Sequence, residues 1–328
     1  MRVLVIGASG FVGRRVVDAL AHCGWARPIA AYHRRRPAVA ATDAISLDAS
    51  DPDDLGDALG RVDAVVNAFA GSPAATVREA QALVLSMRRL QSPPRLVHLS
   101  SMAVYGAARG VVDERTPLVG TASGYGAGKV AAEAILSHYA NAVILRPSCV
   151  YGPASIQWSE RMMRLLIQRR LGDLGMAGTG NCNLVYVDDL VDAILRGLRG
   201  AELAGAQFNI SMPSALSWND YFAATAAALG IAPLRRVPGY RLLAESFLLA
   251  PFVEVIARLS NRTSSPRPGI VTIPPSLRRL FKQAIQIDSR RAERALGLHW
   301  TPLELGLQKT VEAFRCTSQN AESLRSPT

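Results

Sequence analysis

The amino-acid sequence predicts an α/β fold, a doubly wound parallel sheet with a smaller C-terminal region. Short apolar runs alternate with helical patterns through the first half of the 328 residues. Most of these runs are apolar on both faces, as is typical of strands buried in a parallel sheet. Strands separated by helices form right-handed βαβ units, and such units build a sheet with helices on both faces.

Each expected strand is bounded by glycine, proline or polar residues. The strands span residues 3–6, 29–32, 64–67, 96–99 and 143–145. The helices span residues 12–22, 53–59, 74–90, 125–139, 159–170 and 188–199. Beyond residue 150 the alternation becomes irregular. We therefore expect a sheet domain at 1–150, a smaller part at 151–315 from which some segments return to the sheet, and a disordered tail at 316–328.

Composition is that of an ordinary globular protein, with 49% apolar and 19% charged residues. The most apolar stretch, residues 242–259, contains Glu245, Pro251, Glu254 and Arg258, so we expect no transmembrane segment. The apolar run that follows Met1 is too short for a leader peptide. The four cysteines lie far apart, and the histidines show no ligand pairing. This pattern fits a reducing cytoplasm and predicts neither disulfides nor a metal site.

The formal net charge is +11. It indicates either attraction for an anionic small molecule or simply a basic surface in contact with water. The basic residues are scattered apart from residues 34–36, and no aromatic residues alternate with them, so nucleic-acid binding is not expected. The role of the basic stretch at 262–279 is left open by the sequence.

A glycine-rich turn joins the first strand to the first helix. Gly7 permits a tight turn, Gly10 lets the backbone approach a pyrophosphate, and Gly13 lets the helix pack close to the strand. The helix N-terminus then offers unpaired N–H groups to the phosphates. The sequence therefore predicts a Rossmann-type dinucleotide site at Gly7, Ser9, Gly10, Phe11, Val12 and Gly13.

The residues after the second strand favour NADP over NAD. An NAD site places a carboxylate there to bind the ribose hydroxyls, whereas His33, Arg34 and Arg35 stand there in this chain. Arginine pairs with a 2′-phosphate, so we expect NADP to be preferred and NAD to be the alternative. The alternative is that these arginines only form a turn exposed to water and have no role in cofactor choice. Asp48 and Ala49 are expected on the adenine side.

Tyr125 and Lys129 are four residues apart in an expected helix, so both point from one face. A free tyrosine has a pKa near 10 and is a poor base at neutral pH. A neighbouring cation favours the phenolate, so Tyr125 is expected to exchange a proton with a substrate oxygen. Residues 96–106 supply a strand that ends in Ser100 and Ser101, where a hydroxyl can bind the same oxygen.

Four blocks occur in a characteristic order after the GxxGxxG turn: the strand that ends in two serines, the Tyr125-to-Lys129 segment, residues 145–153 and residues 184–190. Together they resemble the NAD-dependent epimerase/dehydratase family, the extended short-chain dehydrogenases. The resemblance runs from residue 1 to about 200, with a weaker echo at residues 295–302.

The resemblance implies that Tyr125 is the acid/base, that Lys129 tunes it and also holds the nicotinamide ribose, and that Ser101 is the catalytic hydroxyl, with Ser100 as the adjacent alternative. It further implies that two segments line the cofactor. They are Ala68, Phe69 and Ala70 after the third expected strand, and Pro147, Ser148 and Val150 in the loop after the fifth. Members of the family commonly form homodimers through the helices expected here at 74–90 and 125–139.

Departures from the family pattern narrow the reaction. Family dehydratases carry an Asp-Glu pair directly after the hydroxyl residue, where this chain has Met102 and Ala103, so dehydration is not expected. Many sugar-nucleotide enzymes of the family have asparagine where this chain has Cys149. We expect these three residues and Trp158 to face the substrate.

The sequence thus favours hydride transfer at a secondary alcohol or ketone. With a nucleotide-sugar substrate the reaction would be 4-epimerisation or 4-keto reduction. One alternative is a reductase or dehydrogenase of a sterol-like or other apolar alcohol. A second is a non-catalytic regulator that senses a dinucleotide, although a sensor needs only the phosphate loop.

Overall fold

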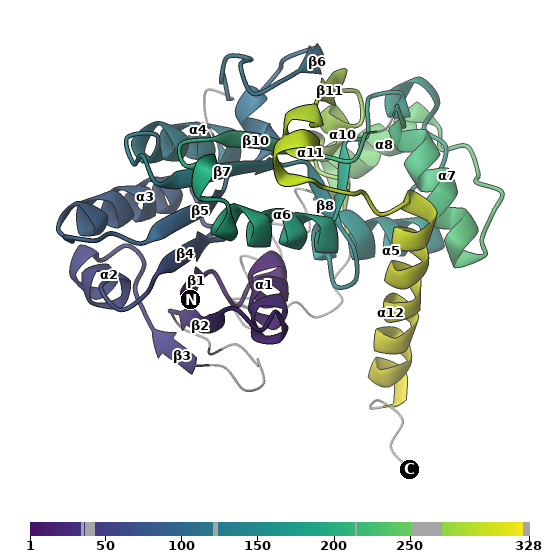
Figure 1. The fold of residues 1–328 in the computed structure, drawn as a ribbon. Helices are drawn as coiled ribbons and strands as arrows, with labels where there is room; N and C mark the ends of the chain where they lie inside the picture. The colour runs from purple at the N-terminus through teal and green to yellow at the C-terminus, as the bar shows by residue number, and fades with distance from the viewer. Residues whose placement is uncertain (34–35, 37–42, 121–123, 214, 251–270, 324–328) are drawn as a thin grey trace. The chain divides into compact units, whose positions relative to one another are not determined.

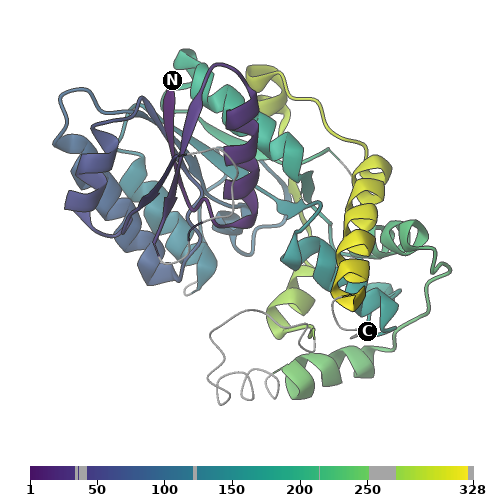
Figure 2. The same ribbon diagram turned by 90° about the horizontal axis from the view of Figure 1, so that it is seen from below.

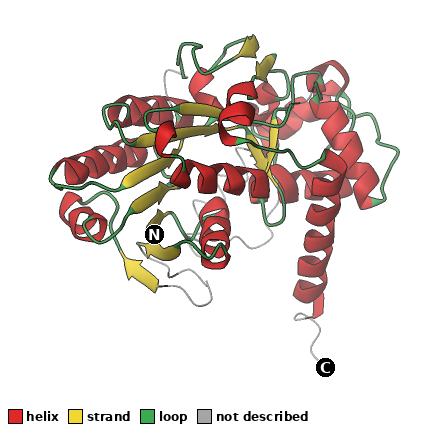
Figure 3. Ribbon diagram, in the orientation of Figure 1, coloured by secondary structure: helices red, strands yellow, loops and turns green. Residues whose placement is uncertain are grey.

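The computed structural model describes residues 1–33, 36, 43–120, 124–213, 215–250 and 271–323 (Figure 1), with side chains described as far as residue 318. The chain forms two compact units. The first contains residues 1–150, 185–213 and 287–300. The second contains residues 151–184, 214–286 and 301–328. Strands concentrate in the first unit, whereas the second consists mostly of helices and loops (Figure 3).

The first unit contains a seven-stranded sheet in the order β10-β7-β5-β4-β1-β2-β3. The strands are β1 (Arg2–Ile6), β2 (Arg27–Tyr32), β3 (Asp43–Ser46), β4 (Ala64–Asn67), β5 (Arg95–Leu99), β7 (Ala142–Pro147) and β10 (Gln207–Ile210). All six pairings are parallel, which confirms the predicted doubly wound sheet. The order reverses between β1 and β4, and open sheets bind ligands at the carboxyl ends of the strands at such a point.

Burial explains which strands the sequence reveals. Every residue of β4 and β7 is buried, as expected for central strands covered on both faces. β3 and β10 form the two edges of the sheet. Both were absent from the predicted strands, because an edge strand tolerates polar residues such as Asp43 and Gln207.

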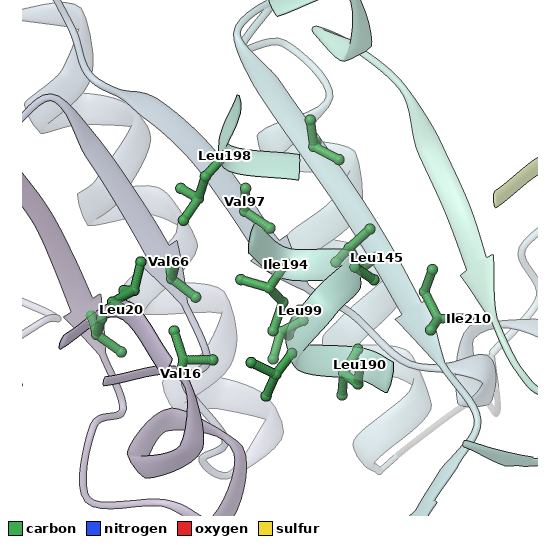
Figure 4. Packing of buried hydrophobic residues seen from close by; sticks show 14 of the residues in the cluster. Val16, Leu20, Val66, Val97, Leu99, Leu145, Leu190, Ile194, Leu198 and Ile210 are labelled. Atoms are coloured by element: carbon green, nitrogen blue, oxygen red, sulfur yellow. The ribbon is translucent and has the colours of Figure 1, made fainter. Parts of the chain in front are cut away.

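Helices cover both faces of this sheet (Figure 2). One face packs against α1 (Phe11–His22), α6 (Val187–Arg199) and α11 (Arg290–Leu296). Figure 4 shows Val16 and Leu20 of α1 and Ile194 of α6 in this core. The other face packs against α2 (Pro52–Leu59), α3 (Pro73–Arg88) and α4 (Tyr125–Leu136).

Side-chain caps fix where two of these helices begin. Asp51 precedes α2 and accepts hydrogen bonds from the backbone N–H groups of Asp53 and Asp54. Ser72 precedes α3 and accepts one from Ala75. The helix α6 instead begins at Val187 without a side-chain cap, so Asp188 and Asp189 lie in its first turn rather than at the N-cap position.

The remaining strands are short. They are β6 (Gly110–Val112), β8 (Cys149–Tyr151), β9 (Leu184–Tyr186) and β11 (Ile285–Ile287). Single 3-10 turns are η1 (Met102–Tyr105), η3 (Gly175–Gly178) and η4 (Ala201–Leu203).

The second unit is built around an aromatic core. Trp218 is fully buried, and its ring centroid lies 5.0 Å from that of Phe281. Its described helices are α5 (Arg161–Ile167), α7 (Trp218–Leu229), α8 (Gly239–Ala244), α10 (Pro275–Leu280) and α12 (Leu303–Ser323). The wide turn η2 (Ile156–Glu160) precedes α5, and the wide turn η5 (Glu245–Leu249) continues α8. The helix predicted at 159–170 is therefore longer than the observed α5, and its first two predicted residues belong to η2.

The last described helix corrects one expectation. α12 continues to Ser323, so residues 316–323 are helical rather than part of a disordered tail. Buried Leu307 and Val311 anchor the helix, and the chain after them simply continues it. Thr317 supports the extension, because its hydroxyl donates to the carbonyl oxygen of Ala313 at 2.9 Å. Of the residues described here, no helix combines the length and the apolar character needed to cross a bilayer.

Candidate active site

The turn after β1 requires glycine at two positions. Gly7 has a positive φ of 80°, and a Cβ there would lie 2.6 Å from the carbonyl oxygen of Ala68. A Cβ on Gly13 would overlap the carbonyl oxygen of Gly7. The Gly10 N–H closes the turn by donating to that same oxygen at 2.9 Å. The backbone of α1 therefore starts as close to β1 as the chain allows.

The start of α1 is suited to an anion. Gly10 is the N-cap residue and provides no side-chain acceptor for the first-turn N–H groups. Ser9 and Gly10 are exposed, and Phe11 and Val12 are half-buried. Positive charge of the helix dipole adds to these donors. These residues fit the diphosphate of a dinucleotide.

The residues predicted on the adenine side lie just after β2 and β3. The His33 Nδ1 atom is 3.8 Å from Asp48 Oδ2, and both side chains are about half exposed. Asp48 Oδ1 accepts a hydrogen bond from the Ser50 N–H at 2.9 Å, which shapes the turn that leads to α2. Ala49 packs against the neighbouring core. Arg34 and Arg35, on which the expectation of NADP depends, lie outside the described residues.

The segment after β4 lies beside the glycine turn. The Ala68 N–H donates to the carbonyl oxygen of Ile6 at 3.0 Å, and the Phe69 N–H donates to Asn67 Oδ1 at 3.1 Å. These bonds fix the course of Ala68, Phe69 and Ala70 at the point where the strand order reverses.

At the end of β4, just before this segment, a buried cluster of polar side chains occurs that the sequence analysis did not predict. Asn67 Nδ2 donates to Glu79 Oε1 at 2.8 Å and to His98 Nδ1 at 3.0 Å. Burial raises the pKa of Glu79 to about 7, and burial lowers the pKa of His98. The positive charge of Lys129 acts on both groups.

Tyr125 is the first residue of α4, and Lys129 follows one turn later. The Ser101 side chain lies near enough to the Tyr125 hydroxyl to favour its ionised form. The tyrosine is 48% exposed. Partial burial nevertheless raises the pKa of Tyr125, and only the nearby Ser101 side chain lowers it. This differs from the expectation that Lys129 lowers the pKa, because the cost of desolvating a phenolate dominates here.

The two serines at the end of β5 have different partners. Ser101 accepts a hydrogen bond from the Ala103 N–H at 3.2 Å and begins η1. Ser100 is buried and donates to Glu133 of α4. Of the two serines, the structure therefore brings Ser101 to Tyr125.

Lys129 is buried at the ends of two strands. Its Nζ donates to the carbonyl oxygen of Leu99 at 2.7 Å and to that of Phe69 at 3.3 Å. Burial lowers the pKa of Lys129 to about 8, against the opposing effect of Glu79 and Glu133. The ammonium is thus held in place beside the end of β4 and is largely charged at neutral pH.

Helix α4 approaches α3 closely through a glycine. A Cβ on Gly128 would lie 2.8 Å from the Cα atom of Pro73, the first residue of α3. Position 128 lies directly before Lys129, so this contact sets the depth at which the helix carrying Tyr125 lies against the unit.

A buried ion pair joins α4 to the strand β7. Arg146 of β7 donates to both carboxylate oxygens of Glu133, with Nη2 to Oε2 at 2.7 Å. Arg146 Nη1 donates to the Tyr105 hydroxyl at 3.0 Å, and that hydroxyl donates to Asn209 Oδ1 at 2.6 Å. These bonds connect α4, β7, η1 and β10. Arg146 lies in the block of residues 145–153 described above, but no sequence pattern indicated that Glu133 is its partner.

The residues predicted to face the substrate fall in both units. Met102 and Ala103 are half-buried in η1. Cys149 is buried, and this burial raises the pKa of its thiol. Trp158 belongs to the second unit, where its ring centroid lies 5.9 Å from that of Trp218.

The residues after β7 are held at the edge of the sheet. The Ser148 N–H donates to the carbonyl oxygen of Ile210 at 3.0 Å. Pro147 and Ser148 are buried, and Val150 is half-buried. This arrangement fixes the segment that the resemblance assigned to the cofactor, and from Cys149 onward that segment is the short strand β8 rather than a loop.

Replacing Gly13 by alanine is expected to lower the free energy of unfolding by about 1–3 kcal/mol, because the new methyl group overlaps the Gly7 carbonyl. The loop must then move, so dinucleotide binding should weaken as well. Denaturant unfolding and a fluorescence titration with the reduced cofactor measure the two effects. Gly56→Ala in α2 is the control, since its Cβ meets no atom within 4 Å and should stabilise the helix by about 0.5–1 kcal/mol. Equal behaviour of the two variants would contradict the close approach at Gly13.

Comparisons with known proteins agree with this geometry. Residues 3–211 match the model of the NAD dependent epimerase/dehydratase family. UDP-glucose 4-epimerase of Mycolicibacterium smegmatis (strain ATCC 700084 / mc(2)155) is 30% identical over 258 residues, which cover 74% of this chain and 68% of that protein.

Solved structures share the fold along almost the whole chain. MoeE5 in complex with UDP-glucose and NAD is 25% identical with a TM-score of 0.69, covering 97% of this chain and 100% of that one. UDP-glucose 4-epimerase from Thermotoga maritima with UDP-glucose is 21% identical with a TM-score of 0.73, at the same coverage. UDP-glucuronic acid 4-epimerase from Bacillus cereus in complex with NAD is 19% identical with a TM-score of 0.70, covering 97% of this chain and 98% of that one. The chain therefore belongs to the NAD-dependent epimerase/dehydratase family and is an enzyme of the extended short-chain dehydrogenase type.

Proposed function

We propose that this enzyme uses NADP in preference to NAD and acts on a nucleotide sugar, as a 4-epimerase or a 4-keto reductase. The observation that carries the proposal is the placement of Tyr125 near the Ser101 side chain, with Lys129 one turn along the same helix. The glycine turn that fits a diphosphate belongs to the same unit. The curated relative in Mycolicibacterium smegmatis is a UDP-glucose 4-epimerase, which supports a nucleotide-sugar substrate.

The side chains suit proton transfer at a substrate oxygen. The Tyr125 and Ser101 hydroxyls can both bind one oxygen, and Tyr125 then gives or takes its proton. Lys129 holds a positive charge one helical turn away and can also bind the ribose of the cofactor. A bound nicotinamide supplies and accepts the hydride.

Two features narrow the reaction class. Met102 and Ala103 stand where an acidic pair would serve elimination, and neither side chain can move a proton. Dehydration is therefore disfavoured. The hydroxyl pair of Tyr125 and Ser101 also disfavours a purely regulatory role, because a sensor of dinucleotides has no use for a proton donor beside the nicotinamide. A reductase of apolar alcohols remains the second candidate on the same residues.

Cofactor choice and net turnover can be tested together. Purified enzyme is expected to bind NADPH more tightly than NADH in fluorescence titrations, and Arg34→Ala with Arg35→Ala should narrow the difference. The enzyme is then incubated with a panel of nucleotide sugars. Supplied with NADP⁺, an epimerase converts the sugar with no net formation of NADPH, because the hydride that leaves the sugar returns to it. Supplied with NADPH and a 4-keto sugar, a reductase consumes one NADPH per product. Tighter binding of NADH would contradict the NADP proposal, and turnover of apolar alcohols alone would contradict the substrate class.

We further propose a homodimer formed through α3 and α4, and a cytoplasmic location. A groove of about 430 Å³ runs over these two helices, and Leu85 is exposed within it. All four cysteines are free, in keeping with a reducing compartment.

A further inference from the structure

The second unit carries a groove of about 650 Å³ outside the residues assigned to the active site. It lies between the chain that follows α5 and the helix formed by α8 with η5. The lining residues are Arg169, Arg170, Val237, Arg241, Ala244, Glu245, Phe247, Leu248 and Leu249. Among the described residues, the groove thus combines an apolar lining with three arginines and one acid.

The helix along this groove has one side buried in the unit and an opposite side that is exposed. Leu242, Ser246 and Ala250 are buried in the unit. Tyr240, with 68% of its surface exposed, and Phe247, with 54%, recur at helical spacing on the other side. Leu248 is 72% exposed beside them. Large apolar side chains gathered on one exposed helix face indicate an interaction surface rather than chance exposure.

The charge around these side chains is positive. Glu245 is paired with Arg170, whose Nε and Nη2 each donate to one of its carboxylate oxygens at 2.6 Å. The guanidinium of Arg278 lies 5.0 Å from the centre of the Phe247 ring. Within the described part of the chain, Arg169 and Arg241 form no ion pair, and both are exposed. Glu245 is therefore neutralised, and the arginines leave a positive surplus among the described lining residues.

We propose that this face docks the enzyme on an anionic lipid bilayer, with Tyr240, Phe247 and Leu248 entering the interface and Arg169 and Arg241 contacting lipid phosphates. Amphipathic helices that lie on membranes have this combination of aromatic and aliphatic side chains with flanking cations. The excess positive charge opposes contact between two copies of the same face. A soluble phosphate would use the arginines and leave the apolar side chains in water.

Vesicle binding tests the proposal. The full-length protein is expected to sediment with phosphatidylcholine vesicles that contain one third phosphatidylglycerol, and much less with phosphatidylcholine alone. Raising the salt concentration should weaken this binding. Each arginine near an anionic surface is worth about 1 kcal/mol, or roughly fivefold, so Arg169→Gln with Arg241→Gln should lower the partition coefficient by about 25-fold. Tyr240→Ser with Leu248→Ser should lower it by at least about 10-fold.

Matched variants separate this face from general effects. Met176→Ser with Val119→Ser removes side chains that are 82% and 70% exposed elsewhere, and Arg61→Gln with Arg109→Gln removes two exposed arginines of the first unit. Both controls should bind vesicles like the unaltered protein. The proposal is overturned if the protein ignores anionic vesicles, if neutral vesicles bind equally well, or if the groove variants bind undiminished. It is also overturned if those variants change only the oligomeric state in light scattering, which would make the face a contact between copies.

Discussion

Replacing Tyr125 by phenylalanine is expected to lower kcat by about 10²–10⁴-fold, because the change removes the proposed proton donor and acceptor. Dinucleotide binding should stay within about twofold, since the binding loop belongs to α1 and β1 rather than to this side chain. The phenylalanine ring fits the same space, and Tyr125 is half exposed, so the fold should be unaffected. Steady-state kinetics on any accepted substrate, together with a cofactor titration, measure the two quantities.

Tyr139→Phe is the matched control for this change. Its hydroxyl donates to the carbonyl oxygen of Pro94 at 2.6 Å, away from Ser101 and Lys129. Losing that bond should cost about 1 kcal/mol of stability and leave kcat unchanged. If the Tyr125 variant kept its turnover while the control behaved as expected, the acid/base assignment would be wrong even though the family assignment would stand.

Replacing Arg146 by methionine is expected to lower the free energy of unfolding by about 3–5 kcal/mol. Both members of its pair with Glu133 are buried, so the substitution leaves a carboxylate without its cation inside the unit. Ser100 would be the remaining side chain bonded to that carboxylate. Chemical denaturation at neutral pH provides the measurement.

Two comparisons make the Arg146 result specific. Arg89→Met breaks an exposed pair with Asp53, at 2.7 Å, and should cost no more than about 1 kcal/mol. Combining Arg146→Met with Glu133→Leu removes both charges and should recover much of the lost stability. A loss at Arg146 no larger than at Arg89, or a double variant less stable than Arg146→Met alone, would show that the pair is not the source of the effect.

The sequence revealed most of the sheet, because buried parallel strands are apolar on both faces. β1, β2, β4, β5 and β7 were expected within about two residues of their observed bounds. The glycine turn and the Tyr125-to-Lys129 spacing were equally visible, since each is a local pattern tied to one strand or one helix. The edge strands β3 and β10 were missed for the opposite reason, as they are short and partly polar.

Buried polar pairs are far harder to see in a sequence. Glu79 and His98 come from α3 and β5, and nothing near either residue indicates that Asn67 binds both. Burial rather than local sequence also decides the pKa of Tyr125, which rises despite a lysine four residues away. In the second unit the core comes from aromatic residues far apart in the chain, such as Trp218 and Phe281.

The contact between Gly128 and Pro73 has a consequence for how this enzyme can be engineered. Specificity can be altered through the loops, but a single methyl group at position 128 would push against main-chain atoms of another helix. The whole of α4 would then tilt, carrying the phenol and the ammonium with it. A residue without any functional group thus limits the positions that the reactive ones can take.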